Sequence, residues 1–462
     1  MRLDLGIKNF TRKIRKKFVL RPVLLIALSF FIVIMLGSIL LVCPFAHEPG
    51  VEVNYLNALF TSVTATCVTG LVDLKDGIAA SYSLAGEIII LVLIQLGGLG
   101  VTSIGTFFVI TIFGLSLSQQ QLIKEAWNLS SAKILKKIFF YTILITAVIE
   151  ILGAILSFVS FYCLQANPMT LEDAIYNGVF HSISAFNNAG IDLLGSQSLI
   201  NHQEPLLLTT TSLLITFGGL GYVVIIDVLA KKFNFKRFKA HTKIVLTMTL
   251  ILFIIGSLMI FLTSYSYTPD VGGGFVLSFE NSMFLCVSTR TAGFTTVDLG
   301  TVPIASLIVM IMLMFVGASP GGTGGGIKTT TIFVIFSYIR SIFQNKEPYG
   351  FRREMNKDAT KKALLLFVVG IVFIILISLI ISVTEMAYGN VIAYDEVLFE
   401  TTSAFATVGL TTGITPGLSE ASRVLLILLM YLGRIGPMSI TTMLKSHNIQ
   451  LWHYVEENIP IG

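Results

Sequence analysis

Long apolar runs alternate with shorter segments that mix apolar and small polar residues. The first apolar run covers 20–42, and similar runs recur near 84–113, 138–164, 206–229, 244–263, 302–339, 363–383 and 424–443. About 18 consecutive apolar residues are enough for a helix that crosses a bilayer. The pattern therefore predicts an all-α integral membrane protein with eight transmembrane helices.

Four shorter segments lie between successive pairs of these runs, at 55–71, 172–191, 276–294 and 392–410. They are too short and too rich in Ser, Thr and Asn to cross the hydrocarbon, so we expect each of them to enter the membrane and turn back. Each ends in a glycine that an apolar residue follows. The chain thus divides into a basic cytoplasmic N-terminus (1–19), four repeats (20–113, 134–229, 242–340 and 362–444) and a cytoplasmic C-terminus (445–462).

The four glycine segments predict a pore. Non-helical backbone survives at membrane depth only where protein encloses it or where it lines a watery cavity. Four such segments entering from one side most economically surround one axis. A helix that ends at the membrane centre points its partially negative C-terminal end there, which favours a cation. Backbone carbonyls beyond that helix can then replace the hydration shell of the ion.

The expected cation filter takes three residues from each repeat. They are Val68, Thr69 and Gly70; Asn188, Ala189 and Gly190; Thr291, Ala292 and Gly293; and Thr407, Val408 and Gly409. Glycine suits the last position because inward-pointing carbonyls need backbone angles that a Cβ would disfavour. A single glycine would fit a helix C-cap equally well, but four at matched positions favour a filter.

Composition and charge agree with a membrane protein. Charged residues make up 12% of the chain, the nine apolar types 54%, and the mean hydropathy is +0.84, which excludes an ordinary soluble domain. Basic residues gather at the N-terminus and in 124–137, 231–243 and 340–362, whereas the other loops hold mainly acids such as Glu400. The positive-inside rule then places both termini in the cytoplasm. A pI near 8.9 needs no nucleic-acid partner in such a chain.

The basic N-terminus could also begin a cleaved secretory signal. The apolar run that follows it is too long for one, and no Ala-x-Ala site is present, so we expect an uncleaved first helix.

The third repeat departs from the others. Its second apolar run contains Pro320 and six glycines within 317–326, which cannot continue a helix, so we expect a non-helical loop below the filter. A nucleotide P-loop is excluded because Ile327 separates the last glycine from Lys328 and no strand precedes it. In the first two repeats the corresponding glycine pairs are expected to permit close helix packing. The fourth repeat has Arg434 there, and a charge inside the membrane is a functional candidate.

The segments 288–294 (STRTAGF), 317–328 (GASPGGTGGGIK) and 432–437 (LGRIGP) closely resemble the Trk/Ktr/HKT superfamily of potassium transporters. The resemblance covers almost the whole chain, and the short stretch of about 20 residues before the first span is similar to that of the bacterial Ktr branch, with its KtrB-type membrane subunits. It implies four membrane-pore-membrane repeats around one pseudo-fourfold pore. It also implies K⁺ uptake across the bacterial cell membrane, with or without dependence on Na⁺, and no enzymatic activity. In plant members, a serine in place of the first filter glycine accompanies Na⁺ preference. The glycine at this position here, Gly70, therefore favours K⁺.

The resemblance further implies an intramembrane gate. Its residues would be Gly317, Ala318, Ser319, Pro320, Gly321, Gly322, Thr323, Gly324, Gly325, Gly326, Lys328 and Arg434. Lys328 could equally mark only the inner end of the break. Arg434, held at pore depth, would both brace the loop and raise the barrier to passing cations.

The partners that the resemblance implies are a second copy of the chain, giving a homodimer, and a cytosolic ring of nucleotide-binding regulatory subunits of the KtrA type. ATP or ADP would act only through that ring, because this chain has no nucleotide-binding fold and requires no cofactor. The basic segments 231–243 and 340–362 are candidates for contact with the ring or with anionic membrane lipid.

Arginine and cysteine residues near the filter are expected to have structural roles. Arg290 is expected behind the filter, paired with Glu280, Asp298 or backbone carbonyls. The four cysteines lack paired spacing and are expected to be buried apolar residues, and no metal motif occurs.

A secondary transporter of a small organic solute would also use broken helices and a site near the middle of the membrane. Fourfold repetition argues against it, and so does the scarcity of intramembrane carboxylates beyond Glu150 and Glu385. A receptor or scaffold would leave the repeated filter unexplained.

Overall fold

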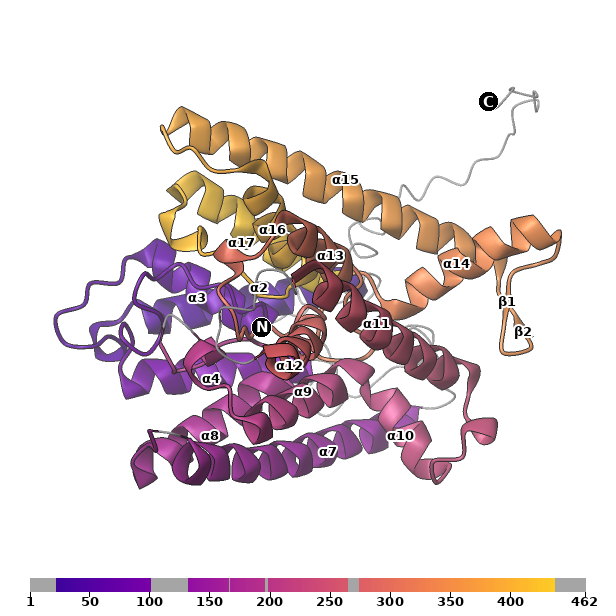
Figure 1. Cartoon of the computed structure of the whole chain (residues 1–462), viewed down its shortest axis with the longest axis horizontal. Coiled ribbons are helices and arrows are strands. Elements are labelled where there is room, and N and C mark those ends of the chain that lie inside the picture. The colour runs from indigo at the N-terminus through magenta and orange to yellow at the C-terminus, as the bar shows by residue number, and fades with distance from the viewer. Residues whose placement is uncertain (1–21, 101–131, 166, 196–197, 265–273, 437–462) are drawn as a thin grey trace, which may run out of the picture.

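The computed structural model describes residues 22–100, 132–165, 167–195, 198–264 and 274–436. Their regular secondary structure is helical except for one two-stranded hairpin (Figure 1). The N-terminal half contains α2 (Pro22–Leu41), α3 (Tyr55–Cys67), α4 (Leu84–Leu99), α7 (Ala132–Val159), α8 (Leu171–Phe186), α9 (Pro205–Leu220) and α10 (Tyr222–Ala230). The C-terminal half contains α11 (Ala240–Ser264), α12 (Gly274–Ser288), α13 (Ile304–Phe315), α14 (Thr329–Gln344), β1 (Tyr349–Gly350), β2 (Arg353–Glu354), α15 (Lys357–Ala387), α16 (Tyr394–Ala406) and α17 (Glu420–Ile435).

The short helices α3, α8, α12 and α16 have 13, 16, 15 and 13 residues, fewer than the roughly 20 that a membrane crossing needs. Two of them begin where a side chain caps a free backbone N–H. The Asn54 side chain accepts a hydrogen bond from the Asn57 amide (2.8 Å), and the Thr170 hydroxyl accepts one from the Asp173 amide (3.2 Å). Such caps set the helix start because the first four N–H groups of a helix have no partner within it.

The core consists of four apolar clusters that link the short helices in a closed ring. The clusters join α3 to α8, α8 to α12, α12 to α16, and α16 back to α3. Each short helix is therefore packed on both sides by its neighbours in the ring, and the ends of all four helices are held together.

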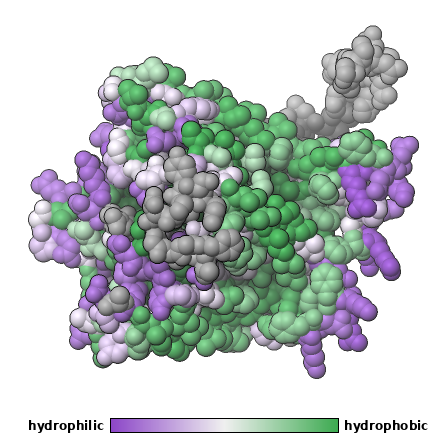
Figure 2. All heavy atoms as spheres, in the orientation of Figure 1, coloured by the Kyte–Doolittle hydropathy of each residue, from purple (hydrophilic) through white to green (hydrophobic). Residues whose placement is uncertain are grey.

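The long helices face outward with large apolar side chains. Leu36 on α2, Ile151 on α7, Leu262 on α11 and Val383 on α15 are each more than half exposed. Figure 2 shows a broad hydrophobic band across the molecule, with hydrophilic residues gathered at its left and right ends. Apolar surface on this scale is unfavourable in water, at about 25 cal/mol for each Å², so the band is the part of the protein that faces lipid.

Three described helices are by themselves long and apolar enough to cross a membrane, namely Phe140–Leu164, Ala240–Ser264 and Lys357–Ala387. The apolar helices Ala27–Leu41, Leu84–Leu99 and Ile304–Phe315 are shorter. These lengths alone do not establish the predicted count of eight spans. The continuations of the runs at 84–113 and 424–443, like all of 1–19 and 445–462, lie outside the described residues.

Two expectations are wrong. The run 206–229 is not one helix, because the chain turns by 94° between α9 and α10. The cysteines are not all buried: Cys67 and Cys286 are, but Cys43 is half-buried and Cys163 exposed, because these two lie at the ends of long helices. The predicted break in the third repeat is confirmed, since α13 ends at Phe315 and α14 begins at Thr329.

Close contact between α17 and α16 predicts a stability effect at Gly433. A Cβ there would overlap the backbone oxygen of Phe405, whereas a Cβ at Gly417 would meet nothing within 4 Å among the described residues. We expect Gly433→Ala to lower the free energy of unfolding by about 1–3 kcal/mol, the usual result of overpacking, and Gly417→Ala to leave it nearly unchanged. Thermal unfolding of the purified protein in detergent measures both, and equal melting temperatures would contradict the packing.

Candidate functional site

Each short helix leads into a residue with left-handed backbone, and a glycine with positive φ follows two residues later. The left-handed residues are Val68, Asn188, Thr291 and Thr407, with φ between 51° and 75°. The glycines are Gly70, Gly190, Gly293 and Gly409, with φ between 65° and 100°. Residues with a Cβ rarely adopt such angles. The same unusual backbone conformation nevertheless recurs at four matched positions.

The four glycines meet around one point. A Cβ at each glycine would press against the carbonyl oxygen just before the next glycine in the ring. Gly70 faces the oxygen of Ala189, Gly190 that of Ala292, Gly293 that of Val408, and Gly409 that of Thr69. The order closes on itself, so the four backbone segments and their carbonyls converge. Eleven of the twelve residues predicted for the filter are buried, and Gly190 is half-buried.

The N–H groups of these segments are held by their own helices. The amides of Thr69, Ala189 and Val408 each donate to a helix carbonyl at 2.8 Å, and the amide of Ala292 does so at 2.9 Å. The amides of Gly70 and Gly409 donate to the hydroxyls of Thr64 (2.9 Å) and Ser403 (3.0 Å). In these six peptide planes the N–H side is occupied, which leaves the carbonyl side free to face the centre.

These hydroxyl acceptors are not among the residues predicted from the sequence, although the sequence holds a signal for them. Thr64, Ser184 and Ser403 all lie six residues before a glycine. In the second segment the Ser184 hydroxyl accepts instead from the Ile191 amide, at 3.1 Å. In the third, the Ser288 hydroxyl donates to the carbonyl of Phe294 at 2.5 Å.

The non-helical segment 316–328 crosses directly beneath this ring. The Thr323 hydroxyl and the side-chain amide of Asn188 are hydrogen-bonded at 3.0 Å. A Cβ at Gly324 or Gly325 would overlap the hydroxyl of Thr291 or Thr407. The segment therefore lies against Asn188, Thr291 and Thr407, the first predicted filter residues of three repeats. Glycine is required at 324 and 325 for so close an approach.

The same segment is also held by its own contacts. The Ser319 and Thr329 hydroxyls are hydrogen-bonded at 2.9 Å across its ends. The amide of Ala318 donates to the carbonyl of Gly325 at 3.3 Å, and a Cβ at Gly317 would overlap that carbonyl. Lys328 Nζ donates to the carbonyls of Gly324 (2.7 Å) and Gly325 (3.3 Å). The lysine thus satisfies carbonyl groups that the break leaves without helical partners.

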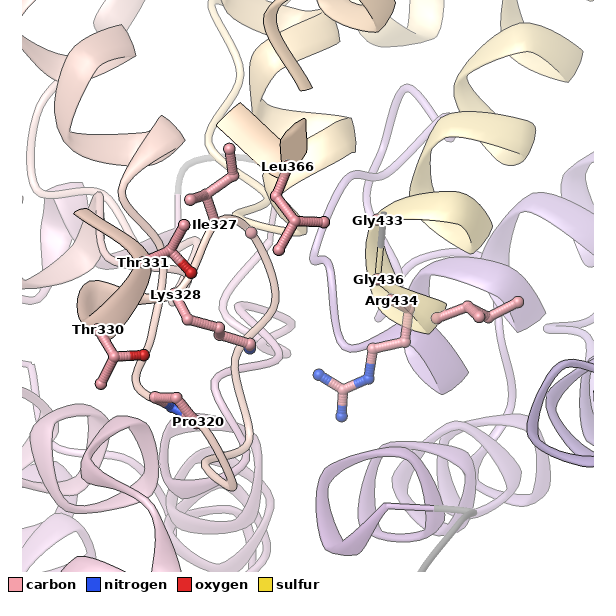
Figure 3. Close-up of a pocket in the computed structure, with 11 residues that line it drawn as sticks. Pro320, Ile327, Lys328, Thr330, Thr331, Leu366, Gly433, Arg434 and Gly436 are labelled. Carbon is pink, nitrogen blue, oxygen red and sulfur yellow. The ribbon is translucent and has the colours of Figure 1, made fainter. Parts of the chain in front are cut away.

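Arg434 reaches the segment from the last turn of α17. One guanidinium nitrogen donates to the carbonyl of Thr323 and the other to the carbonyl of Gly97 on α4. Figure 3 shows Lys328 and Arg434 pointing from opposite sides toward the same space. A cavity of about 310 Å³ lies there, with Pro320, Ile327 and Leu366 also in its wall. Two basic side chains and a proline-containing loop thus line the space below the glycine ring.

Arg290 does not have the expected partners. Among the described residues it forms no salt bridge with Glu280 or Asp298, and its guanidinium donates instead to the Thr249 hydroxyl at 3.4 Å. Glu280 is exposed and the Asp298 side chain accepts from the Gly300 amide. Arg290 is therefore placed behind the ring by packing against α11 and not by an ion pair.

An ion pair near the beginning of α17 joins this helix to the chain that leaves Gly70. Asp73, three residues after Gly70, lies 3.5 Å from Arg423 and is almost fully buried. Burial raises the pKa of the Asp73 carboxyl to about 7, although Arg423 pulls it the other way. The pair exists only when Asp73 is ionised, so protonation of Asp73 as the pH falls below about 7 weakens this link.

The charge pattern of the sequence groups Glu400 with the acids of the loops. In the structure Glu400 lies inside α16, and only 1% of its surface is exposed. Its carboxylate accepts hydrogen bonds from the Thr411 hydroxyl, the Thr412 amide (3.1 Å) and the Thr415 hydroxyl (2.9 Å). These donors lie in the chain that leaves Gly409. A single acid nine residues before that glycine, where the other copies have Thr61, His181 and Phe284, is the signal that sequence reasoning overlooked.

The chain is similar to known proteins over nearly its whole length. A family model described as TrkH, cation transport protein, matches residues 10–452. The potassium/sodium uptake protein NtpJ of Enterococcus hirae is 35% identical over 98% of this chain and 99% of its own. The Ktr system potassium uptake protein B of Vibrio alginolyticus is 35% identical over 95% and 94%, and that of Bacillus subtilis 34% over 90% and 92%. The crystal structure of the potassium transporter TrkH from Vibrio parahaemolyticus has the same fold, with TM-score 0.67 at 16% identity, over 92% of this chain and 84% of that one.

The three donors around Glu400 predict that the carboxyl oxygens matter more than the charge. Glu400→Ala leaves buried donors without a partner, at roughly 1–3 kcal/mol for each, so we expect the melting temperature in detergent to fall sharply. Glu400→Gln keeps one acceptor oxygen and is expected to fall less. Glu396→Gln, one turn earlier on α16 and only half-buried, is the matched control. A Glu400→Ala protein as stable as this control would contradict the anchoring role.

Proposed function

The chain belongs to the TrkH family of cation transport proteins, and from this premise we propose that it is the ion-translocating subunit of a potassium uptake system. Relatives of 34–35% identity over most of their length carry names that specify potassium or potassium and sodium. The observation that carries the proposal is the closed ring in which Gly70, Gly190, Gly293 and Gly409 each face the neighbouring strand's carbonyl. The family is one of transporters, so the chain is not an enzyme, and we propose that K⁺ is its transported ion.

The proposed pore is the axis of that ring, surrounded by eight spans in four membrane-pore-membrane repeats with both termini in the cytoplasm. The repeats are those given above, 20–113, 134–229, 242–340 and 362–444. The circular packing of α3, α8, α12 and α16 supports this arrangement. So does the gathering of hydrophilic residues at the two ends of the outer apolar band (Figure 2).

The proposed filter acts through backbone oxygen. Each short helix directs a C-terminal end, worth about half a negative charge, toward the ring. The carbonyls of Thr69, Ala189, Ala292 and Val408 converge there and can coordinate a cation that has lost its water. Because the amides of Gly70 and Gly409 are already bonded to their helices, the oxygens of Thr69 and Val408 need no reorganisation when the ion arrives.

The proposed gate is the segment 317–328 with Arg434. It lies against Asn188, Thr291 and Thr407 on the inner side of the ring, so a cation leaving the filter meets a loop and two positive side chains. Flow requires that this loop move away. Arg434 opposes that movement because its guanidinium ties Thr323 to α4.

For partners we propose a homodimer on a cytosolic nucleotide-binding ring of the KtrA type. The turn after α10 and the β1–β2 hairpin pack together through Phe235 and Phe351, whose ring centroids are 6.2 Å apart. This contact brings the two segments together, and we propose that the basic residues of 231–243 and 340–362 form one cytoplasmic surface. That surface would attract acidic groups of a ring protein or of lipid headgroups.

The deciding experiment measures uptake of radioactive rubidium into proteoliposomes that hold the purified chain, with and without an added regulatory ring. We expect K⁺ to compete better than Na⁺ or Li⁺. We also expect deletion within 317–328, and separately Arg434→Ala, to raise the flux several-fold because the loop loses its support. Absence of cation flux from the parent chain and from both variants would reject the pore, and uptake of a radiolabelled organic solute would then point to a secondary transporter.

Selectivity is tested at the first glycine. A Cβ at Gly70 would lie 2.5 Å from the oxygen of Ala189, at φ +100°, so Gly70→Ser distorts the carbonyl ring. We expect this variant to lose most of the K⁺/Na⁺ discrimination while it still carries cations. Competition assays on the same proteoliposomes measure this. Unchanged discrimination would remove Gly70 from the filter.

The cytoplasmic surface predicts a salt-sensitive association. Replacing Lys231, Lys232, Lys236 and Arg237 by Gln is expected to weaken binding of a KtrA-type ring about tenfold in detergent, where lipid is absent. Lys75, on the opposite face of the membrane, gives the control Lys75→Gln. Intact ring binding by the quadruple variant would instead assign the surface to anionic lipid.

A further inference from the structure

The break between α9 and α10 presents free backbone groups toward the gate segment. The chain turns by 94° at Gly221, whose φ is 91° and ψ 137°. The last carbonyls of a helix and the first N–H groups of the next have no partners within their own helices. Inside a membrane protein such groups must be satisfied by other protein atoms.

The gate segment supplies the matching partners. The amides of Ser319 and Thr323 donate to the carbonyls of Gly219 (3.0 Å) and Gly218 (3.1 Å) at the end of α9. In the opposite direction, the amide of Tyr222 at the start of α10 donates to the carbonyl of Gly321 (3.2 Å). Three backbone hydrogen bonds therefore connect the helix break to the loop, in addition to the contacts of Arg434 and the filter residues.

The approach at Gly221 is unusually close. A Cβ there would lie 2.7 Å from the oxygen of Pro320 and 3.2 Å from the carbonyl carbon of Gly321. Gly436 ends α17 with nearly the same backbone, φ 87° and ψ 140°, yet a Cβ there would meet no described atom within 4 Å. The two glycines thus share a backbone conformation that disfavours a Cβ, but only Gly221 contacts the loop.

The other end of α10 is anchored on the cytoplasmic side. Asp227 Oδ2 accepts hydrogen bonds from the Thr242 hydroxyl (2.7 Å) and the Lys239 amide (3.0 Å) at the beginning of α11. The helix has nine residues, a length of about 13 Å at 1.5 Å per residue. A rigid element this short carries any displacement of the basic cytoplasmic surface to Tyr222.

We propose that the α9–α10 break is the seat that holds the gate segment closed, and that α10 transmits movement of the cytoplasmic surface to it. Gly221 and Tyr222 are its positioning residues. The inference rests on the proposed function, since it assumes that 317–328 gates a cation pathway. It makes the gate a joint structure of the second and third repeats, with Arg434 of the fourth as its brace.

The seat is tested first by rubidium flux through variants of its two residues. Tyr222→Pro removes the N–H that bonds Gly321, at a first helical position where proline is tolerated. Tyr222→Ala sets the baseline because it removes the same side chain, including its contact with Thr146, and keeps the N–H. We expect several-fold higher flux from Tyr222→Pro than from Tyr222→Ala, and from Gly221→Ala than from Gly436→Ala. Equal flux within both pairs would overturn the seat.

A second measurement guards against misfolded variants. In a background without the native cysteines, Pro320→Cys and Tyr222→Cys are joined by a short bis-methanethiosulfonate, which forms a disulfide with each thiol and releases methanesulfinate. We expect the joined protein to lose most of its flux and to recover it when a reductant cleaves the link, which a folding defect would not do. A joined protein with unchanged flux would contradict the proposal.

Transmission through α10 is tested by a double variant. Asp227→Ala frees the cytoplasmic end of the helix and is expected to change the flux in the native background. In the Tyr222→Pro background it should add nothing, because the connection to the loop is already cut. Additive effects would reject transmission. If loop deletion raises flux but none of these variants does, the gate stands and the seat fails; if neither the parent chain nor any variant conducts, the proposed function itself fails.

Discussion

Every backbone polar group at membrane depth needs a partner from the protein, and this constraint shapes the structure wherever the chain leaves a helix. An unpaired peptide group in an apolar medium costs several kcal/mol. In each of the four converging segments, the amide before the glycine bonds to its own short helix, and in two of them the glycine amide does so as well. Their carbonyls converge on the centre of the ring, and this convergence supports the proposed cation filter.

The loop 316–328 meets the same requirement in a different way. Its backbone forms hydrogen bonds with carbonyls and an amide at the α9–α10 break, with a lysine at its own end and with an arginine of α17. The backbone contacts are individually modest, at about 0.5–1.5 kcal/mol for a neutral hydrogen bond. A segment held by several weak bonds can be released without unfolding the helices around it, which suits a gate.

The molecule combines a nearly symmetric ring with an asymmetric inner side. The short helices pack in a closed circle, whereas the residues beneath them differ from one repeat to the next: glycines at 97 and 98, a bend at Gly221, a loop at 317–328 and a charge at Arg434. In the proposed pore, symmetry would serve ion coordination, because equivalent carbonyls surround one axis. Asymmetry would serve control, because only the one proposed gate loop has to move.

The sequence alone determined the membrane class, the four short glycine-ended segments and the break in the third repeat, because hydrophobic run length, glycine and proline act locally and leave a direct record in the chain. It also indicated that Arg434 would brace the loop. Only the tertiary structure decided which atoms meet: the order of the glycine ring, the 94° bend at Gly221, the inward position of Glu400 and the packing of Arg290 against α11. These features depend on contacts between residues far apart in the chain. The sequence around each residue does not specify which distant residue it will contact, so such contacts could not be predicted locally.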